Sequence, residues 1–210
     1  MTPPLMEGVA SVLAKSRALG FLGPGEVGPQ ISHAAAFATA AESALPHPPA
    51  HVVDLGSGGG IPGLVLAALW PTATFLLVDG STRRCDFLEE AVAELDIAEH
   101  VAVRCGRAED LAHEDSLRGA ADLVVARSFG PPAVLAECAA GLLEVGGSLL
   151  VSEPPEEDGR RWPKDGLESL GFGAARFVNA GARFAVIPLE HPCPDRFPRR
   201  VGVPTKRPLF

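Results

Sequence analysis

The chain has 210 residues, of which 47% are hydrophobic and 21% are charged, and its formal net charge is −8. This length and apolar content suffice for the core of one domain and argue against a disordered chain. The negative charge argues against binding of nucleic acid over the whole surface, because such binding relies on Lys and Arg, but it leaves room for a local basic patch.

Targeting and metal signals are absent from the sequence. The first eight residues lack the basic start and unbroken apolar run of a secretory signal, and no stretch reaches about 18 consecutive apolar residues. We therefore expect a cytoplasmic protein without a membrane span. No two of the four cysteines form a Cys-x-x-Cys pair, and no histidine pairs with a carboxylate at metal-ligand spacing, so we expect neither a disulfide framework nor a bound metal.

Apolar strands alternate with helices along the chain. Helices are predicted at residues 5–18, 29–45, 62–69, 82–95 and 133–143. Buried strands are predicted at residues 52–55, 74–79, 101–103, 121–126 and 148–151, the last one after a Gly146-Gly147 turn. A final hairpin is predicted from strands near 174–178 and 183–187, with its turn at Gly181.

This alternation implies an α/β fold. Apolar strands separated by helices form a parallel sheet covered on both faces, and the hairpin adds an antiparallel edge. We expect a mostly parallel seven-stranded sheet with an antiparallel C-terminal hairpin and short N-terminal helices. The chain divides into a helical segment (1–46), a main domain (47–190) and a basic tail (191–210). The acid-rich stretch 153–158 is interpreted as a solvated loop.

A glycine-rich loop, residues 54–63 with the sequence DLGSGGGIPG, follows the first predicted strand. Open α/β sheets bind ligands at the carboxyl ends of their strands, and glycines let the backbone approach a ligand closely. The spacing of Gly58, Gly60 and Gly63 also satisfies the dinucleotide-binding pattern. The loop alone therefore leaves a dinucleotide and S-adenosylmethionine as alternatives, beside tight packing without any ligand.

Features outside the loop favour S-adenosylmethionine. Asp54, at the end of the first strand, can orient a cationic amino-acid group, whereas it would repel a pyrophosphate. Asp79 ends the second strand, where it can accept both ribose hydroxyls of either cofactor. Residues 107–110 (RAED) suit an adenine edge, and the Gly-Gly turn before the fifth strand is more typical of methyltransferases than of dehydrogenases.

Several stretches together resemble one methyltransferase family. They are residues 53–64, 77–79, 83–84, 87–88, 107–110, 126–129 and the tail 197–208 (FPRRVGVPTKRP). In these stretches the chain resembles the RsmG family, also called GidB, of guanine-N7 methyltransferases of small-subunit ribosomal RNA. The resemblance implies a Rossmann-like class I methyltransferase fold, S-adenosylmethionine as cofactor, and 16S ribosomal RNA or the small-subunit precursor as substrate. We also expect a monomer, although the sequence does not fix the oligomeric state. It also implies that the cofactor contacts come from Gly56, Ile61, Ala108, Glu109 and Arg127. The glycine-rich loop and the strand ends add four candidate cofactor-binding residues, which are Asp54, Gly58, Gly60 and Asp79.

The sequence departs from the family pattern on the substrate side. The family's N-terminal Asn-Leu-Thr stretch is absent, only His33 remains of its Arg-His and Asp-Ser pairs, and Ser152-Glu153 replaces Lys-Gly. A related methyltransferase acting on a small molecule or another RNA therefore stays as an alternative. A non-catalytic Rossmann-like binding module is a third hypothesis.

The proposed chemistry requires few reactive side chains. Guanine N7 is an unprotonated lone pair, so no general base is needed, and Arg127 is the candidate catalytic residue because it can donate to a guanine oxygen or order the cofactor. Residues 128–132 (SFGPP) lack the acid amide and the aromatic residue typical of amino-group methylation. Pro192-Cys193 follows the last strand, away from the loop that a cytosine-C5 methyltransferase would use. Oxygen methylation would favour a general-base histidine, for which the candidates are His33, His100 and His113.

Charge is unevenly distributed along the chain. Residues 86–115 hold ten acids and two arginines, whereas residues 196–210 hold five basic residues and no acid. The tail is therefore a candidate phosphate-binding segment, with a disordered solubilising tail as the alternative. Its candidate RNA-binding residues are Arg199, Arg200, Lys206 and Arg207.

Overall fold

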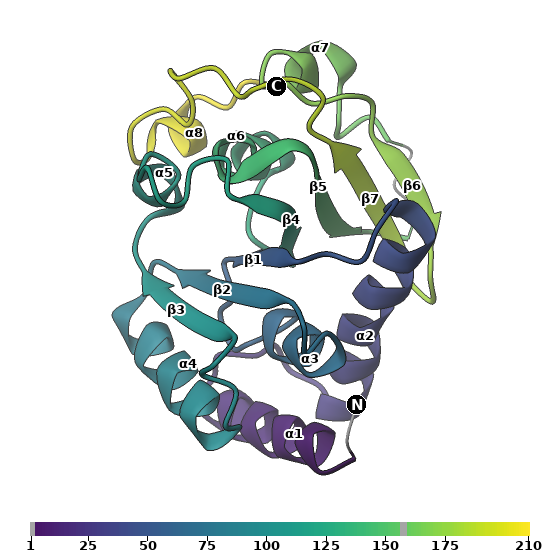
Figure 1. Ribbon diagram of the computed structural model, residues 1–210, viewed down its shortest axis with the longest axis vertical. Coiled ribbons are helices and arrows are strands. Elements are labelled where there is room, and N and C mark those ends of the chain that lie inside the picture. Colours follow the sequence, from purple (N-terminus) through teal and green to yellow (C-terminus); the bar gives the residue numbers. More distant parts are fainter. Residues whose placement is uncertain (1–2, 156–158) are drawn as a thin grey trace.

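Seven strands form one sheet in the order β3-β2-β1-β4-β5-β7-β6 in the computed structural model, which describes residues 3–155 and 159–210. The strands are β1 (His51–Leu55), β2 (Thr74–Asp79), β3 (Val101–Cys105), β4 (Ala121–Ala126), β5 (Leu143–Glu153), β6 (Arg176–Asn179) and β7 (Arg183–Pro188). Strands β1 to β5 run parallel, β7 pairs antiparallel with β5, and β6 pairs antiparallel with β7 (Figure 1). The predicted mixed sheet with its terminal hairpin is confirmed.

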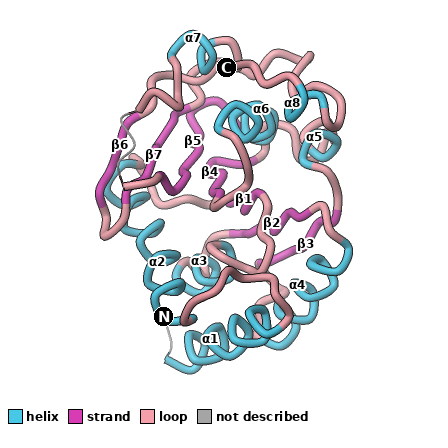
Figure 2. Tube along the Cα trace, turned by 180° about the vertical axis from the view of Figure 1, so that it is seen from behind, coloured by secondary structure: helices cyan, strands magenta, loops and turns pink. Residues whose placement is uncertain are grey.

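Helices cover both faces of this sheet. They are α1 (Pro3–Ala18), α2 (Val27–Ala44), α3 (Gly63–Leu69), α4 (Thr82–Glu94), α5 (Ala108–Leu111), α6 (Pro132–Leu142), α7 (Lys164–Glu168) and α8 (Val203–Lys206). Figures 1 and 2 show α1 to α4 on one face and α5 to α8 on the other. No helix among the described residues is long and apolar enough to cross a membrane.

Side chains of the central strands alternate between two apolar cores. Val52 of β1 and Leu123 of β4 belong to the core under α1 to α4, whereas their neighbours Val53 and Val124 belong to the core under α5 to α7. Successive strand residues point to opposite faces, so a strand covered on both faces must be apolar throughout. Asp122, near the start of β4, is polar, and its carboxylate accepts the backbone N–H groups of residues 50 and 51 at 2.6 and 3.0 Å.

Strand β5 is longer than predicted at both ends. Gly146 and Gly147 lie inside the strand, and Gly146 has a φ of +96°. The pairing of β5 with β4 shifts its register at this point. The predicted turn is therefore an irregularity within the strand pairing. At the other end, Glu153 is not part of a solvated loop. Its side chain is 1% exposed and accepts hydrogen bonds from Arg161 Nη1 at 3.0 Å and Trp162 Nε1 at 3.1 Å. Residues 156–158 of that predicted loop lie outside the described residues.

The N-terminal helices share a core with the sheet rather than forming a separate layer. Val12 and Leu13 of α1 and Phe37 of α2 belong to the same buried cluster as Leu66 of α3 and Val52 of β1. The predicted boundary near residue 46 follows the end of α2 at Ala44. The division of the chain into three segments therefore stays a description of the sequence, while the packing joins the first two.

Candidate active site

The glycine-rich loop after β1 needs glycine at its turning points. Gly56, Gly58 and Gly60 have φ angles of +78°, +55° and +97°, which L side chains rarely adopt. A Cβ on Gly56 would lie 2.7 Å from the Phe129 ring. Ser16 of α1, fully buried, donates its hydroxyl to the Gly59 carbonyl at 2.9 Å. Helix α1 thus stabilises the loop through this hydrogen bond. No motif in the sequence indicated the contact.

Asp54 lies beneath this loop and not in a ligand site. Its carboxylate has no exposed surface, one oxygen accepts the Gly63 N–H at 2.9 Å at the start of α3, and the other has no partner in the described part of the chain. Burial raises the pKa of Asp54 to about 7, against the lowering effect of the Gly63 and Ser57 hydrogen bonds. The loop itself covers the side chain of Asp54, and the predicted contact of Asp54 with the cofactor stays a prediction.

We expect Asp54→Asn to stabilise the protein at neutral pH. The folded-state pKa is raised, so the unfolded chain loses the proton near pH 4 and the folded chain only near pH 7. The free energy of unfolding of the wild type therefore falls as pH rises between these values. The fall is up to roughly 4 kcal/mol, because each pKa unit corresponds to about 1.4 kcal/mol. Urea unfolding at pH 4 and pH 8 should show little difference between the proteins at the lower pH and a more stable variant at the higher pH. Equal stability at pH 8 would contradict the raised pKa.

Asp79, at the end of β2, faces a cavity and also shapes the glycine loop. One oxygen accepts the Gly58 N–H and the other the Ser81 N–H, each at 2.9 Å. Arg84 Nη1 lies 3.7 Å from this carboxylate. A carboxylate oxygen can accept more than one hydrogen bond, so Asp79 retains capacity to accept a ribose hydroxyl.

The first cavity, of about 210 Å³, lies on the Asp79 side of the glycine loop. Glu109 is 2% exposed, and its Oε1 accepts the Arg107 guanidinium at 3.2 Å and the Gly202 N–H at 3.1 Å. Burial alone would raise the pKa of Glu109, but the hydrogen bonds from Gly202, its own N–H and Arg107 outweigh it and lower the pKa. The carboxylates of Asp79 and Glu109 thus both lie at the wall of this cavity. It is lined by Gly56, Val78, Asp79, Gly80, Gly106, Arg107, Ala108, Glu109, Phe129, Gly130, Pro131, Val134 and Thr205.

The second cavity, of about 190 Å³, lies on the other side of Gly56. The predicted residues Gly58, Ile61 and Arg127 line it, whereas Gly60 supports the loop from below, where a Cβ would meet Leu64. Because Gly56 lines both cavities, an extended ligand crossing this residue would occupy both.

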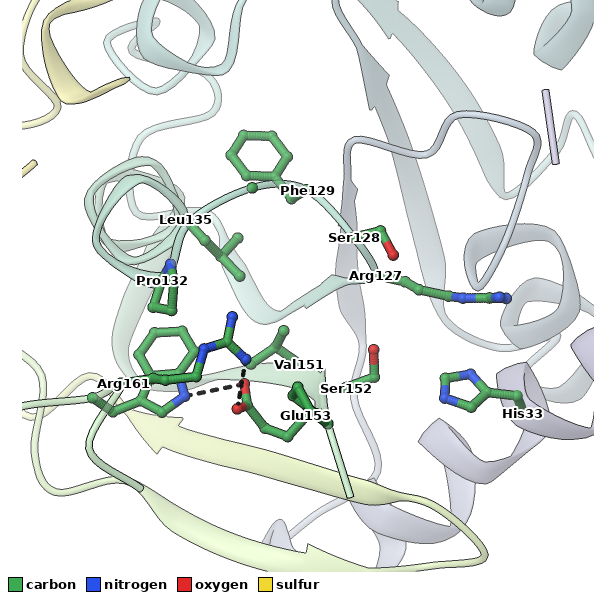
Figure 3. A pocket seen from close by; sticks show the side chains of 13 residues that line it. His33, Arg127, Ser128, Phe129, Pro132, Leu135, Val151, Ser152, Glu153 and Arg161 are labelled. Atoms are coloured by element: carbon green, nitrogen blue, oxygen red, sulfur yellow. Dashed lines mark hydrogen bonds and ion pairs between the residues drawn. The ribbon is translucent and has the colours of Figure 1, made fainter. Parts of the chain in front are cut away.

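The third cavity, of about 340 Å³, adjoins the first two through the segment 127–130 after β4. Arg127 and Ser128 line the second and third cavities, whereas Phe129 and Gly130 line the first and third. Figure 3 shows Arg127 and His33 on one side of this third cavity and Arg161 with Glu153 on the other. Burial lowers the pKa of Arg127, which forms no ion pair within the described residues.

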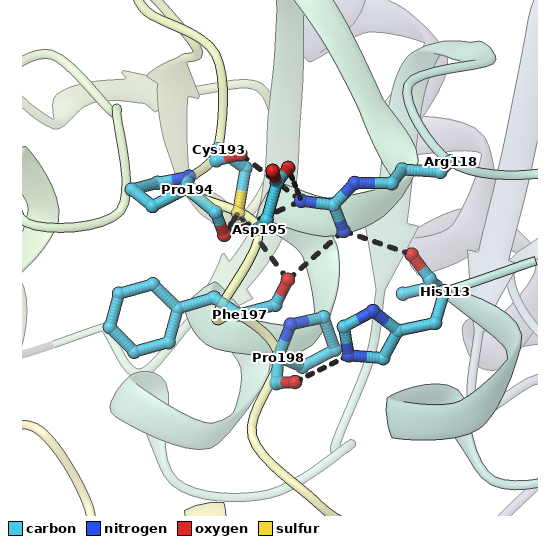
Figure 4. A network of polar contacts seen from close by, with 8 residues as sticks. His113, Arg118, Cys193, Pro194, Asp195, Phe197 and Pro198 are labelled. Atoms are coloured by element: carbon cyan, nitrogen blue, oxygen red, sulfur yellow. Dashed lines mark hydrogen bonds and ion pairs between the residues drawn. The ribbon is translucent and has the colours of Figure 1, made fainter.

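The C-terminal tail is fastened to the domain. Arg118 donates to the carbonyls of Cys193 at 3.1 Å and Phe197 at 3.0 Å, and His113 Nε2 lies 2.7 Å from the Pro198 carbonyl oxygen (Figure 4). Burial raises the pKa of the Cys193 thiol in this network. The alternative of a disordered tail is wrong, since these contacts hold it against the α5 and α6 side of the sheet.

The candidate RNA-binding residues of the tail differ in their environment. Arg199 is bound to Glu137, a fully buried acid of α6, through its backbone N–H at 2.7 Å, Nε at 2.9 Å and Nη2 at 2.7 Å. Arg200, Lys206 and Arg207 are exposed. Arg199 therefore has a structural partner that the sequence did not reveal, and the exposed bases are the ones free to meet a phosphate.

We expect Arg199→Ala to lower the free energy of unfolding by about 3 kcal/mol, because it leaves the buried Glu137 carboxylate without its ionic partner. Urea unfolding measures this loss, and Arg200→Ala, an exposed neighbour, serves as control. Adding Glu137→Leu to an Arg199→Met protein should recover much of the stability, since the unpaired charge is then absent. A loss below about 1 kcal/mol for Arg199→Ala would contradict the assigned role.

Thr205 is a site residue that the sequence analysis missed. It lies on α8 and lines the first cavity, because Gly202, three residues earlier, donates to Glu109. The tail was interpreted only through its charge. No local pattern indicates that a residue so near the end of the chain returns to the carboxyl ends of β2 and β3.

Comparison with known proteins identifies the family. The GidB family, described as rRNA small subunit methyltransferase G, matches residues 34–156. The ribosomal RNA small subunit methyltransferase G of Moorella thermoacetica is 34% identical over 172 residues, covering 77% of this chain and 70% of that protein. The protein of the same name from Deinococcus radiodurans is 39% identical over 166 residues, covering 75% of this chain and 65% of that protein.

Solved structures agree on the fold. Cofactor-bound Rv0187 from MTB aligns with a TM-score of 0.61 at 18% identity, over 88% of this chain and 91% of that chain. Human N-acetylserotonin methyltransferase in complex with SAM aligns with a TM-score of 0.50 at 20% identity, over 68% of this chain and 48% of that chain. At these identities the likeness establishes the Rossmann-like methyltransferase fold alone. With the sequence match over more than half of its length, the chain belongs to the GidB family of rRNA small subunit methyltransferase G.

Proposed function

We propose that this protein transfers a methyl group from S-adenosylmethionine to N7 of a guanine in 16S ribosomal RNA. The observation that carries the proposal is the junction of three cavities at Gly56 and the segment 127–130. Two of the cavities suit the two halves of the cofactor, and the third offers a place for the methyl acceptor. The proposal takes the protein to be a cytoplasmic monomer.

The residues of the first two cavities fit this cofactor. Asp79 would accept the ribose hydroxyls, and Ala108 and Glu109 would meet the adenine edge in the first cavity. Gly58, Ile61 and Arg127 would surround the amino-acid portion in the second cavity. Gly58 supports the fit, since a Cβ there would meet only the Gly56 carbonyl oxygen at 3.7 Å, so the backbone borders open space. Asp54 acts through the loop that it holds.

The protein contributes positioning rather than acid–base chemistry. When bound, S-adenosylmethionine supplies a methyl group on a sulfonium, and the attacking guanine N7 brings its own lone pair. Arg127, at the edge between the second and third cavities, would donate to O6 beside N7 and so orient the lone pair toward the methyl group. The buried site holds its donors in place before the substrate arrives, which is how such groups lower a barrier.

The exposed bases of the tail would contact the RNA backbone. Arg200, Lys206 and Arg207 lie on or beside α8, the helix whose Thr205 lines the first cavity. Phosphate contacts of this kind supply affinity without sequence information. The basic segment of an otherwise acidic chain would then lie beside the proposed cofactor cavity.

A methyltransferase with another acceptor is the second candidate. It is favoured by Ser152-Glu153 at the third cavity, where the family pattern has Lys-Gly, since Glu153 there forms a buried ion pair with Arg161. A small molecule or another RNA would then replace the ribosomal target. A non-catalytic binding module is the third candidate, and it would bind the cofactor without turnover on any acceptor.

Two measurements separate these functions. Calorimetric titration should show tight S-adenosylhomocysteine binding, and binding of NAD(H) in its place would overturn the proposed cofactor. A strain that lacks the gene should lose one N7-methylguanine from its small-subunit RNA, and the wild-type gene should restore it. Unchanged RNA together with intact S-adenosylhomocysteine binding would favour the second or third candidate.

A further inference from the structure

The third cavity has the composition of a site for a single planar base. Its apolar wall comes from Pro132, Leu135 and Val151, and the aromatic residues Phe129 and Trp162 also line it. Enzymes that modify a base inside a folded RNA take it out of its stack and hold it between aromatic or apolar side chains. A volume of about 340 Å³ lies within the range of small-ligand pockets.

Two polar atoms at this cavity have no partner. They are Nδ1 of His33, from α2, and Nη1 of Arg127, from the segment after β4, and both are buried without a hydrogen bond in the described part of the chain. Buried polar atoms are nearly always paired in folded proteins, and an unpaired one costs about 1–3 kcal/mol. Two such atoms from distant segments, carried by residues on the same side of one cavity (Figure 3), indicate a ligand that can form hydrogen bonds there.

The charge state of this pair selects the kind of acceptor. Burial, and next the positive charge of Arg127, lower the pKa of His33, so the imidazole is neutral at pH 7 and carries one N–H. The Phe37 and Phe184 rings also pack beside it, each with its centroid 5.9 Å from the imidazole centroid. Guanine presents the acceptors O6 and N7 on its major-groove edge, whereas adenine presents an amino donor in place of O6. With its proton on Nδ1, His33 would join Arg127 as a second N–H donor, and two such donors would accept guanine and oppose adenine.

Glu153 stabilises the opposite wall of the cavity through its hydrogen bonds and ion pair. Its 1% exposed carboxylate binds Arg161 and the Trp162 indole N–H, which fixes Trp162 along the cavity. Where the family pattern has Lys-Gly, this chain has Ser152-Glu153, and the buried ion pair of Glu153 with Arg161 stabilises this wall of the third cavity.

We propose that the third cavity binds the extruded guanine and that His33 recognises its O6 together with Arg127. This inference rests on the proposed function and extends it, since it assigns the acceptor site and a specificity-determining residue. Cofactor binding and acceptor recognition are separable because His33 lines only the third of the three cavities.

Kinetics on small ribosomal subunits from a strain lacking the gene tests the role of His33. His33→Ala should lower kcat/KM at least 30-fold and leave the affinity for S-adenosylhomocysteine within about twofold, as expected for loss of a hydrogen bond to the acceptor. His33→Asn, which can place an amide N–H near the position of Nδ1, should recover part of the loss. Ser32→Ala, the exposed neighbour on α2, is the matched control. Wild-type kcat/KM for His33→Ala would overturn the inference.

A spectroscopic titration tests the site itself. The chain has two tryptophans, Trp70 at the end of α3 and Trp162 in the cavity, so Trp70→Phe leaves one reporter. With S-adenosylhomocysteine bound, guanosine monophosphate should change the Trp162 fluorescence with millimolar affinity, and adenosine monophosphate should bind at least tenfold more weakly. An unchanged Trp162 signal, or equal responses to both nucleotides, would overturn the inference. Failure of S-adenosylhomocysteine to bind would instead overturn the proposed function.

Discussion

Gly58→Arg is expected to weaken S-adenosylhomocysteine binding at least 100-fold, a loss of about 2.7 kcal/mol. Gly58 borders the second cavity and has a φ of +55°, with no side chain near the position of a Cβ. An arginine side chain there would fill the space proposed for the amino-acid portion of the cofactor and repel its positive charge. Isothermal titration calorimetry measures the loss.

The control for this variant must carry the same backbone strain. Gly181 has a φ of +78° at the turn between β6 and β7, also with open space at its Cβ position, and it lines none of the three cavities. A non-glycine residue in this region costs roughly 1–2 kcal/mol, so Gly181→Arg reproduces the destabilisation without the obstruction. It should bind S-adenosylhomocysteine as the wild type does. Comparable binding by Gly58→Arg would exclude the glycine loop from the cofactor site.

Arg127→Ala is expected to lower the rate of methyl transfer by about 10²–10³-fold, the usual effect of removing one preorganised donor from an active site. Its buried Nη1 has no partner among the described residues, so the side chain is available to a ligand, and its place between the second and third cavities puts it beside the transferred group. Single-turnover methylation of small subunits with saturating cofactor isolates this step from cofactor binding.

Two further variants define what Arg127 contributes. Arg127→Lys keeps the charge but loses the planar fork of donors, so a rate close to that of Arg127→Ala would show that geometry matters more than charge. Arg176→Ala, on the exposed surface of β6, should leave the rate unchanged. A wild-type rate for Arg127→Ala would remove this residue from the catalytic machinery.

Some elements could be predicted almost to the residue because their signal is local. The bounds of β2 and β4 agree with the sequence prediction, since each contains a buried apolar run that ends where the chain turns polar or small. Helices α5, α7 and α8 were missed because four or five residues carry no measurable periodicity. Strand β5 is longer than predicted because a glycine pair, with Gly146 at positive φ, has the same local signature inside a strand as in a turn.

The sequence by itself determined the fold class, the family and the loop on which the site is built, because glycine spacing, strand-end acids and apolar periodicity are properties of neighbouring residues. Burial and partner choice are not, since they depend on segments far apart in the chain. Only the tertiary structure placed Asp54 beneath the loop, bound Arg199 to Glu137 and brought Thr205 to the first cavity. It also decided how the net charge of −8 is arranged around the site. Part of the basic tail is bound to buried acids, and the exposed remainder lies beside the first cavity.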